Sequence, residues 1–471
     1  MRFSIENIGA IDSATVDIDG ITIIAGENNV GKSTIGKALF AFLHDMSEWE
    51  KIYDKSCYLI IKGFLYQNSV WLEDFCMKNS GAKKRRTSKS LQLIHQYATD
   101  AEFRVALEDY QICEESDGLD GSDNSLNAYL KDYCLDYLSL YFKETKEKLS
   151  CLYANDLSQW ITHALKELRQ LNLSEVELQQ NTIKQSLHDV FKGQYRKIGK
   201  VDYKISFTDE WDREIHFIGK DSVDHLDNPI RLTKNVYFVE TPRIYDYISS
   251  AKFANDPKGY LRRMMVPNTF KTPITTTSSY SSTKDSVDDM ASDLLMIIDH
   301  LTHTMGGRAE FYQKIGLEFK DRNIPETIHS VNVSTGLKSL ALLEYALRIG
   351  AIERGDIMVL DEPEINLHPE WQLEYAKAIV ELQKSYGIKF IITSHSPFFI
   401  RSIECYTDIK GTMDQLNVYR VSRSNAAGTP KVINVSYSEY GMSDLYEDLS
   451  APLDKLDALL DEKYGIEDGE K

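Results

Sequence analysis

Apolar and polar residues near the N-terminus predict a strand, a loop and a helix in direct succession. Residues 21–25 form an apolar run of strand length, and residues 26–34 then read G-E-N-N-V-G-K-S-T. After this loop, apolar residues recur at helical spacing up to about His44. A glycine-bounded loop between a strand and a helix is the context that a phosphate-binding loop requires.

Residues 1–25 are predicted to form two short strands around a turn. The first contains Phe3, Ile5 and Ile8, and the second extends over residues 16–24. The pair Asp19-Gly20 supplies turn chemistry just before the strand that leads into the loop.

Between residues 46 and 200 the pattern changes to amphipathic helices rich in tyrosine and leucine. Two examples of the helical spacing are Leu126, Leu130, Tyr133, Tyr137 and Leu138, and then Leu157, Trp160, Ile161, Leu165 and Leu168. A polar break over residues 114–125 divides two helical groups. The aromatic stripe is interpreted as helix packing and not as a cofactor site.

The remaining chain alternates between strand and helix patterns. Residues 201–218 predict a hairpin, and the serine- and threonine-rich residues 268–286 predict a loop or linker. The other predicted strands are residues 236–239, 356–361, 389–394, 416–421 and 432–435, and the other helices are 287–305, 369–386 and the acidic segment 443–464.

Composition places the chain among globular proteins and limits its partners. It has 471 residues, of which 42% are hydrophobic and 27% charged, and no apolar run approaches the roughly 20 residues that span a bilayer. The formal charge of −18 disfavours a surface that binds DNA everywhere but allows one basic groove. Six cysteines without C-x-x-C pairs are typical of a reduced, cytoplasmic protein without a membrane anchor.

The loop residues have the chemistry of a nucleoside triphosphate site. Gly26 and Gly31 allow a tight turn whose N–H groups face a phosphate, and the following helix adds its positive end. Lys32 is predicted to reach the β- and γ-phosphates, and the Ser33 hydroxyl to ligate Mg²⁺. The predicted ATP-binding residues of this loop are Asn28, Asn29, Gly31, Lys32, Ser33 and Thr34. The alternative is an ordinary glycine-containing turn.

Two later strands end in residues that suit the same site. Residues 356–363 read D-I-M-V-L-D-E-P, so that Asp361 follows a buried-type strand and is predicted to hold Mg²⁺. Glu362 is placed to polarise the attacking water, and His395, after the strand 389–394, to donate to the γ-phosphate or that water. One helix separates these strands, so their ends are expected to be neighbours in the sheet.

The stretch S-T-G-L-K, residues 334–338, begins a predicted helix. Ser334 is a natural N-cap, and taken alone the stretch is simply a capped helix. Its position before Asp361 favours a second role for Ser334, Gly336 and Lys338 at a nucleotide.

The order of these motifs resembles the ATPase heads of the ABC superfamily, in the branch of SMC, RecF and OLD-like proteins. The resemblance covers about residues 1–45 and 230–400 and implies an α/β ABC-type head, with a mixed sheet and flanking helices, interrupted by a large helical insertion. It makes Lys32 and Ser33 the Walker A pair, Asp361 and Glu362 the Walker B pair, and His395 the switch histidine. Ser334, Gly336 and Lys338 become signature residues that act on ATP held by the opposite subunit. The signature departs from the L-S-G-G-Q type, and the Q-loop glutamine is not placed.

The predicted domain boundaries follow from these assignments. Residues 1–45 form the first part of the head, 46–200 the insertion, 201–425 the remainder of the head, and 426–471 an acidic tail segment.

The resemblance also implies partners. The chain is most similar to the ATPase subunit of the Septu anti-phage system (PtuA-like), which works with a separate HNH nuclease. A homo-oligomer built from head-to-head dimers is therefore expected, as is a nuclease partner. The short segment after His395 contains no D-x-D pair, so no nuclease activity of its own is expected, and nucleic acid is expected to be contacted mainly through the partner.

Two other functions remain open from the sequence. A DNA-repair or chromosome-structure ATPase that clamps DNA needs a basic groove, for which the cluster Lys83, Lys84, Arg85 and Arg86 is a candidate, although such a cluster is also typical of a solvated loop. The ATPase of a membrane transporter is disfavoured by the long insertion and the unusual signature.

Overall fold

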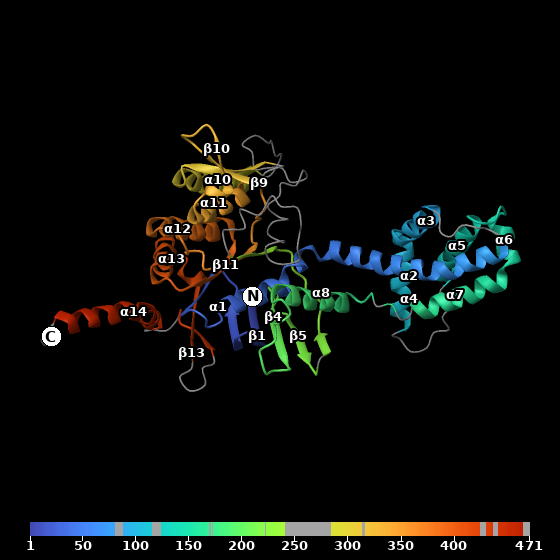
Figure 1. Cartoon of the computed structure of the whole chain (residues 1–471), viewed down its shortest axis with the longest axis horizontal. Helices are drawn as coiled ribbons and strands as arrows, with labels where there is room; N and C mark the ends of the chain where they lie inside the picture. Colours follow the sequence, from blue (N-terminus) through green and yellow to red (C-terminus); the bar gives the residue numbers. More distant parts are fainter. Residues whose placement is uncertain are drawn as a thin grey trace. The chain divides into compact units, whose positions relative to one another are not determined.

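The chain folds into two compact units, and the second is one continuous segment inserted into the sequence of the first (Figure 1). The computed structural model describes residues 1–80, 88–114, 124–168, 171, 173–221, 223–240, 284–312, 316–423, 430–436 and 441–464. The first unit comprises Met1–Ser47 and Gln179–Lys471, and the second Glu48–Leu178. The predicted class, an α/β head interrupted by a helical insertion, is confirmed.

The second unit consists of helices. They are α2 (Trp49–Ser80), α3 (Ser88–Ala98), α4 (Ala101–Glu114), α5 (Asn124–Ser139), α6 (Lys146–Leu152) and α7 (Ala154–Leu168). Tyr133, Tyr137 and Trp160 are buried in its core, with 6.0 Å between the ring centroids of Tyr133 and Trp160. The interpretation of the aromatic stripe as helix packing is thus confirmed.

The unit boundaries differ from the predicted domain limits. Residues 179–200 belong to the first unit, because Gln179 of α8 (Glu175–Val190) exchanges two hydrogen bonds with the backbone of Ile230, at 3.0 and 2.7 Å. Residues 430–434 also belong to the first unit, because they form a strand of its main sheet and not a separate tail.

The main sheet of the first unit has the order β14-β13-β3-β12-β11-β7. Its strands are β3 (Ile21–Gly26), β7 (Val236–Val239), β11 (Ile357–Asp361), β12 (Lys389–Ser394), β13 (Leu416–Arg423) and β14 (Pro430–Asn434). All neighbours are parallel except β14, which runs antiparallel to β13. β11 and β12 are neighbours, with Asp361 opposite Thr393, so this expectation from the sequence is confirmed.

A second sheet is antiparallel, with the order β2-β1-β4-β5-β6. Its strands are β1 (Arg2–Ile8), β2 (Ile11–Asp17), β4 (Tyr203–Thr208), β5 (Glu214–Lys220) and β6 (Val223–Leu226). β4 and β5 form the hairpin predicted over residues 201–218.

The prediction of two N-terminal strands was wrong, because the structure has three. β2 pairs with β1 in the antiparallel sheet, whereas β3 enters the parallel sheet between β12 and β13. The chain changes sheet over residues 18–20, where Gly20 has a φ of 65°. Apolar residues continue at strand spacing through residues 18–20, so the apolar spacing gave no sign that one strand ends and another begins there.

The helix after the phosphate loop, α1 (Lys32–Leu43), packs between the two sheets. Phe42 contacts Phe3 and Phe207 of the antiparallel sheet, while Phe40 contacts Phe238 of β7. Both faces of α1 are therefore buried, which fixes the start of the helix against the ends of the parallel strands.

The remaining helices and a small sheet complete the first unit. The helices are α10 (Lys284–Thr304), α11 (Thr335–Arg348), α12 (Pro369–Tyr386), α13 (Pro397–Lys410) and α14 (Gly441–Tyr464), and the small sheet contains β8 (Gly307–Tyr312), β9 (Gly316–Asp321) and β10 (Thr327–His329). α10 contacts both α11 and α12, and α12 packs on β12. Within the described ranges, no helix is both long and apolar enough to span a bilayer.

Three features named from the sequence fall wholly or mostly outside the described residues. They are the basic cluster 83–86, most of the polar break 114–125, and most of the serine- and threonine-rich segment 268–286.

Candidate functional site

The loop between β3 and α1 has the backbone of an anion-binding turn. Gly31 caps α1 in the left-handed conformation at φ 94°, and Asn29 also has a positive φ, of 62°. Such left-handed residues turn successive N–H groups to one side, where the N-terminus of α1 adds its partial positive charge. Asn28 and Asn29 are exposed in this loop. The loop therefore fits a phosphate group.

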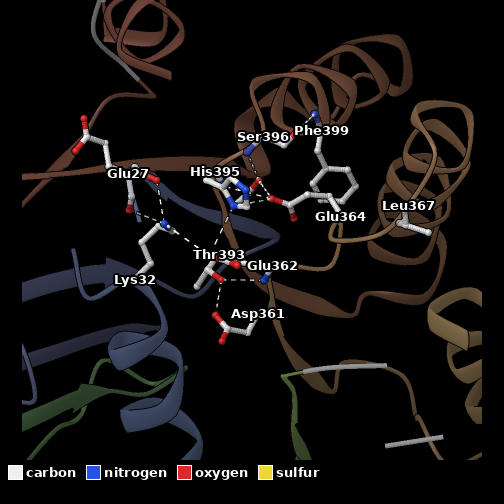
Figure 2. A network of polar contacts seen from close by, with 12 residues as sticks. Glu27, Lys32, Asp361, Glu362, Glu364, Leu367, Thr393, His395, Ser396 and Phe399 are labelled. Atoms are coloured by element: carbon white, nitrogen blue, oxygen red, sulfur yellow. Dashed lines mark hydrogen bonds and ion pairs between the residues drawn. The ribbon is translucent and has the colours of Figure 1, made fainter. Parts of the chain in front are cut away.

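Lys32 is the buried cation of the site. Its side chain is 3% exposed, and Nζ donates to the carbonyl oxygens of Gly26 and Glu27 at 2.9 and 2.7 Å (Figure 2). Nζ also lies 3.8 Å from Oε1 of Glu362. Burial lowers the Lys32 pKa, and the carboxylates of Glu362, Glu364 and Asp361 oppose this effect. The ammonium group of Lys32 is thus surrounded by oxygen atoms, and it can bind phosphate oxygens in the same way.

Thr393 connects the side chain of Asp361 to the backbone of Glu362 at the end of β11. Its hydroxyl donates to Oδ1 of Asp361 at 2.6 Å and accepts from the backbone N–H of Glu362 at 3.0 Å. Glu362 has a φ of 51°, in the left-handed region that non-glycine residues rarely adopt. Such backbone strain concentrates at functional sites because the surrounding structure must hold it in place. Sequence reasoning missed Thr393, since a threonine inside a buried strand carries no signal by itself.

His395 lies between two glutamates beyond the ends of β11 and β12 (Figure 2). Its Nδ1 is 3.7 Å from Oε1 of Glu362 and 3.7 Å from Oε1 of Glu364. The His395 side chain is 39% exposed, whereas that of Glu364 is 4% exposed. Lys32, Glu362 and His395 therefore form a continuous series of charged and polar groups at one edge of the sheet. The family resemblance places Glu364 in the D-loop region, residues 364–368, but its burial beside Ser394 and His395 was not predicted from the sequence.

Ser33 and Asp361 have the donor atoms that a magnesium ion prefers. Ser33 is at the start of α1 and half-buried, and hydroxyl and carboxylate oxygens are suitable ligands for this hard cation. No group of three or more His, Cys, Asp or Glu side chains in the described part of the chain is arranged for a metal. A magnesium ion held by these two residues would take its remaining ligands from phosphate and water. The Thr34 side chain lies beside Gly9: a Cβ added at Gly9 would be 2.8 Å from Cγ2 of Thr34.

Ser334, Gly336 and Lys338 form the first turn of α11. The Ser334 hydroxyl accepts from the backbone N–H of Leu337 at 3.3 Å, so it caps this helix as expected. Gly336 packs against the loop after β11, since a Cβ there would lie 2.7 Å from the carbonyl oxygen of Asn366. Lys338 is buried at 4% exposure. Within one chain, these residues therefore cap α11 and tie it to the segment that follows Asp361 and Glu362.

A mainly apolar cavity borders the carboxylate end of β11. Its walls include Leu342 and Leu343 of α11 and Met358 of β11, and Glu240, Asp361 and Glu362 contribute its acidic part. Glu240 follows β7 and pairs with Lys37 of α1 at 2.8 Å. Apolar walls do not suit a triphosphate, so we place the nucleotide at the loop and not in this cavity. Glu240 was also missed, because its place beside Asp361 depends on the pairing of β7 with β11.

Comparison with known proteins gives one extended family match. The model of a family described as "AAA ATPase domain" matches residues 1–400. The Retron Ec83 probable ATPase of Escherichia coli is 28% identical over 133 residues, which are 26% of this chain and 22% of that protein. The matched part is therefore less than a quarter of the relative's length.

Solved structures of SMC heads also resemble the chain. The SMC head domain from Thermotoga maritima has 10% identity and a TM-score of 0.35, with 92% of this chain and 98% of that chain covered. An Smc head with an extended coiled coil, bound to the C-terminal domain of ScpA from Pyrococcus furiosus, has 12% identity, a TM-score of 0.31 and coverage of 95% and 98%.

Proposed function

The chain belongs to the AAA ATPase domain family, and we propose that it is the ATP-hydrolysing regulatory or sensor subunit of an anti-phage defence complex. The observation that carries the catalytic part is the series Lys32, Glu362 and His395, with Nζ–Oε1 and Nδ1–Oε1 distances of 3.8 and 3.7 Å. A cation, a carboxylate and an imidazole within reach of one another are groups that can bind a phosphate, orient a water and stabilise charge during phosphoryl transfer.

Each residue has a defined role in this proposal. The loop N–H groups and Lys32 bind the β- and γ-phosphates of ATP, and Glu362 orients the attacking water and accepts its proton. His395 donates a hydrogen bond to the γ-phosphate, where negative charge is concentrated. Ser33 and Asp361 would hold Mg²⁺, which neutralises phosphate charge when bound.

The regulatory part requires a second copy of the chain. In this proposal two heads meet with their phosphate loops facing each other's α11, so that Ser334 and Gly336 of one copy contact ATP held by Lys32 of the other. Lys338 adds a positive charge near the same nucleotide. ATP binding then favours the closed pair and hydrolysis releases it, which makes the nucleotide state a conformational switch.

The output of the switch is assigned to a partner. We place the nuclease activity on a separate HNH-type subunit, which also provides most contacts with nucleic acid. A relative named as the probable ATPase of a retron supports a role as one component of a larger system. The helical unit Glu48–Leu178 offers a surface for protein contacts.

Mixing two inactive variants tests the shared site directly. Lys32→Ala removes the phosphate contact, and Ser334→Glu places a negative charge where the partner's triphosphate would lie. Each variant alone is expected to lose ATP turnover. In a mixed pair, one site combines the intact Lys32 of one copy with the intact Ser334 of the other, so turnover should recover to a substantial fraction of the wild-type rate.

Two outcomes would contradict parts of the proposal. If the mixture stays as inactive as its components while each variant folds, Ser334 does not act across a subunit contact. If the purified chain alone cleaves DNA in the presence of a divalent metal, the nuclease does not reside on a partner. Co-expression with the product of the neighbouring reading frame, followed by a cleavage assay with and without ATP, tests the partner itself.

A further inference from the structure

Glu364 makes contacts beside His395 that have no role in the proposed reaction. Its Oε1 accepts a hydrogen bond from the Ser394 hydroxyl at 2.6 Å and another from the backbone N–H of His395 at 3.2 Å. The same oxygen lies 3.7 Å from Nδ1 of His395. One buried carboxylate oxygen thus joins the loop after β11 to the residues that end β12 and carry His395 (Figure 2).

Two polar atoms in this cluster have no hydrogen-bond partner among the described residues. They are Oε2 of Glu364 and Nδ1 of His395. One is an acceptor and the other is a donor when Nδ1 carries a proton, and both belong to side chains that already lie close together. A small rotation of the ring or of the carboxyl group would let each satisfy the other.

A purely structural role for Glu364 explains less. A glutamine at this position would accept the same two hydrogen bonds from Ser394 and the His395 backbone without burying a charge. Burial of a carboxylate costs free energy, which the hydrogen bonds to the charged acceptor offset. Burial also raises the pKa of Glu364, and the hydrogen bonds from Ser394 and His395 only partly oppose this effect. Hydrogen bonding between the loop after β11 and the end of β12 therefore does not by itself explain why this residue is a glutamate and not a glutamine.

We propose that Glu364 is a positioning residue for ATP hydrolysis: its carboxylate accepts a hydrogen bond from Nδ1–H of His395 and so holds the ring, while Nε2–H of the doubly protonated ring faces the nucleotide as the donor. This inference rests on the proposed ATPase function. A carboxylate paired with one ring nitrogen fixes which nitrogen faces it, and therefore the orientation of the histidine ring. Glu362 then remains available for the attacking water, and the two neighbouring glutamates have different roles because one is 4% and the other 25% exposed.

A double-mutant cycle on the full chain tests the proposal. Glu364→Gln, His395→Gln and the double variant are compared with wild type for kcat and KM of ATP turnover. Glu364→Gln is expected to lower kcat about 10- to 100-fold, the usual effect of losing a group that orients a catalytic histidine, with KM nearly unchanged. Because Glu364 acts through His395, the double variant should be no slower than His395→Gln alone.

Glu344→Gln is the matched control. Glu344 is also a fully buried glutamate, but it bonds Arg348 on α11 and is remote from His395 in the contacts described. We expect its turnover to stay within about twofold of wild type. An unchanged kcat in Glu364→Gln, or a kcat loss that multiplies with that of His395→Gln, would overturn the proposal.

Ser394→Ala provides a second route should Glu364→Gln fail to fold. It removes one hydrogen bond to the same carboxylate, and its smaller loss of kcat should likewise disappear in the His395→Gln background; a loss that persists there counts against the proposal. If wild-type protein hydrolyses no ATP, the ATPase proposal itself fails, and that result is distinct from any outcome of the cycle.

Discussion

The core of the helical unit and the charged edge of the parallel sheet both bury polar atoms, but in different ways. In the helical unit, the Trp160 indole donates to the carbonyl of Asn68 and the Tyr133 hydroxyl to that of Leu65, each at 3.3 Å. These groups are neutral and lie among apolar side chains. At the sheet edge, Lys32 and Glu364 are buried as ionisable groups, and Glu362 has a strained backbone.

This difference separates stability from function. Burial of a neutral, hydrogen-bonded aromatic ring contributes to stability, whereas an ionisable group buried beside others of mixed sign costs free energy unless its neighbours compensate. We therefore expect substitutions in the helical core to unfold that unit without changing ATP chemistry. Substitutions at the sheet edge should alter chemistry with small or even favourable effects on stability.

Trp160→Ala should have the largest effect on stability. Truncation of a buried tryptophan removes its apolar contacts and leaves a cavity, which typically costs about 3–5 kcal/mol. Chemical denaturation followed by circular dichroism measures the loss for the helical unit, and ATP affinity of the same variant measures the head. A variant that keeps its helical unit folded but loses ATP affinity would contradict this separation of stability in the helical unit from function in the head.

Lys32→Ala should weaken ATP binding and leave folding stability unchanged, the reverse of the effect of Trp160→Ala. Loss of the charged hydrogen bonds to phosphate is expected to weaken ATP binding at least about 100-fold, or about 2.7 kcal/mol, with no loss of folding stability. Isothermal titration with a non-hydrolysable ATP analogue measures the affinity. Lys51→Ala is the control, because Lys51 is an exposed lysine of α2 that pairs only with Glu48 at 3.0 Å in the contacts described. Unchanged affinity in Lys32→Ala would contradict the assignment of the phosphate loop.

The smallest effect is a pH dependence of stability. Burial raises the folded-state pKa of Glu364, so ionisation costs more in the folded than in the unfolded chain. Its contribution to the free energy of unfolding therefore decreases as pH rises from the ordinary glutamate value of about 4.3 to the raised value. Glu364→Gln should be as stable as wild type, or less, at the acidic end and gain relative to it as pH rises.

Urea denaturation of both proteins across this pH range measures the difference. Other buried acids with a raised pKa, such as Glu344 and Asp356, are present in both proteins and cancel. A stability difference that is constant with pH would mean that ionisation of Glu364 costs no more free energy in the folded state than in the unfolded state.

Several elements could be read from the sequence because their signals are local. The strand, loop and helix around Lys32, the N-cap at Ser334 and the helix Pro369–Tyr386 each depend on residues within a few positions of one another. The three N-terminal strands could not be separated in this way. Strand propensity was continuous there, and only the pairing partners of β2 and β3 distinguish them.

By itself, the sequence predicted which residues bind and hydrolyse a nucleotide, and it determined that a helical insertion interrupts the head and where that insertion begins, to within a few residues. The tertiary structure alone decided that β3 lies between β12 and β13, which brings Lys32 to the edge where Glu362 and His395 lie, and that Glu364 is buried against Ser394. The physical reason is that helix, turn and strand preferences act between near neighbours. Sheet order and the burial of a charge, in contrast, depend on contacts between segments that lie far apart in the sequence.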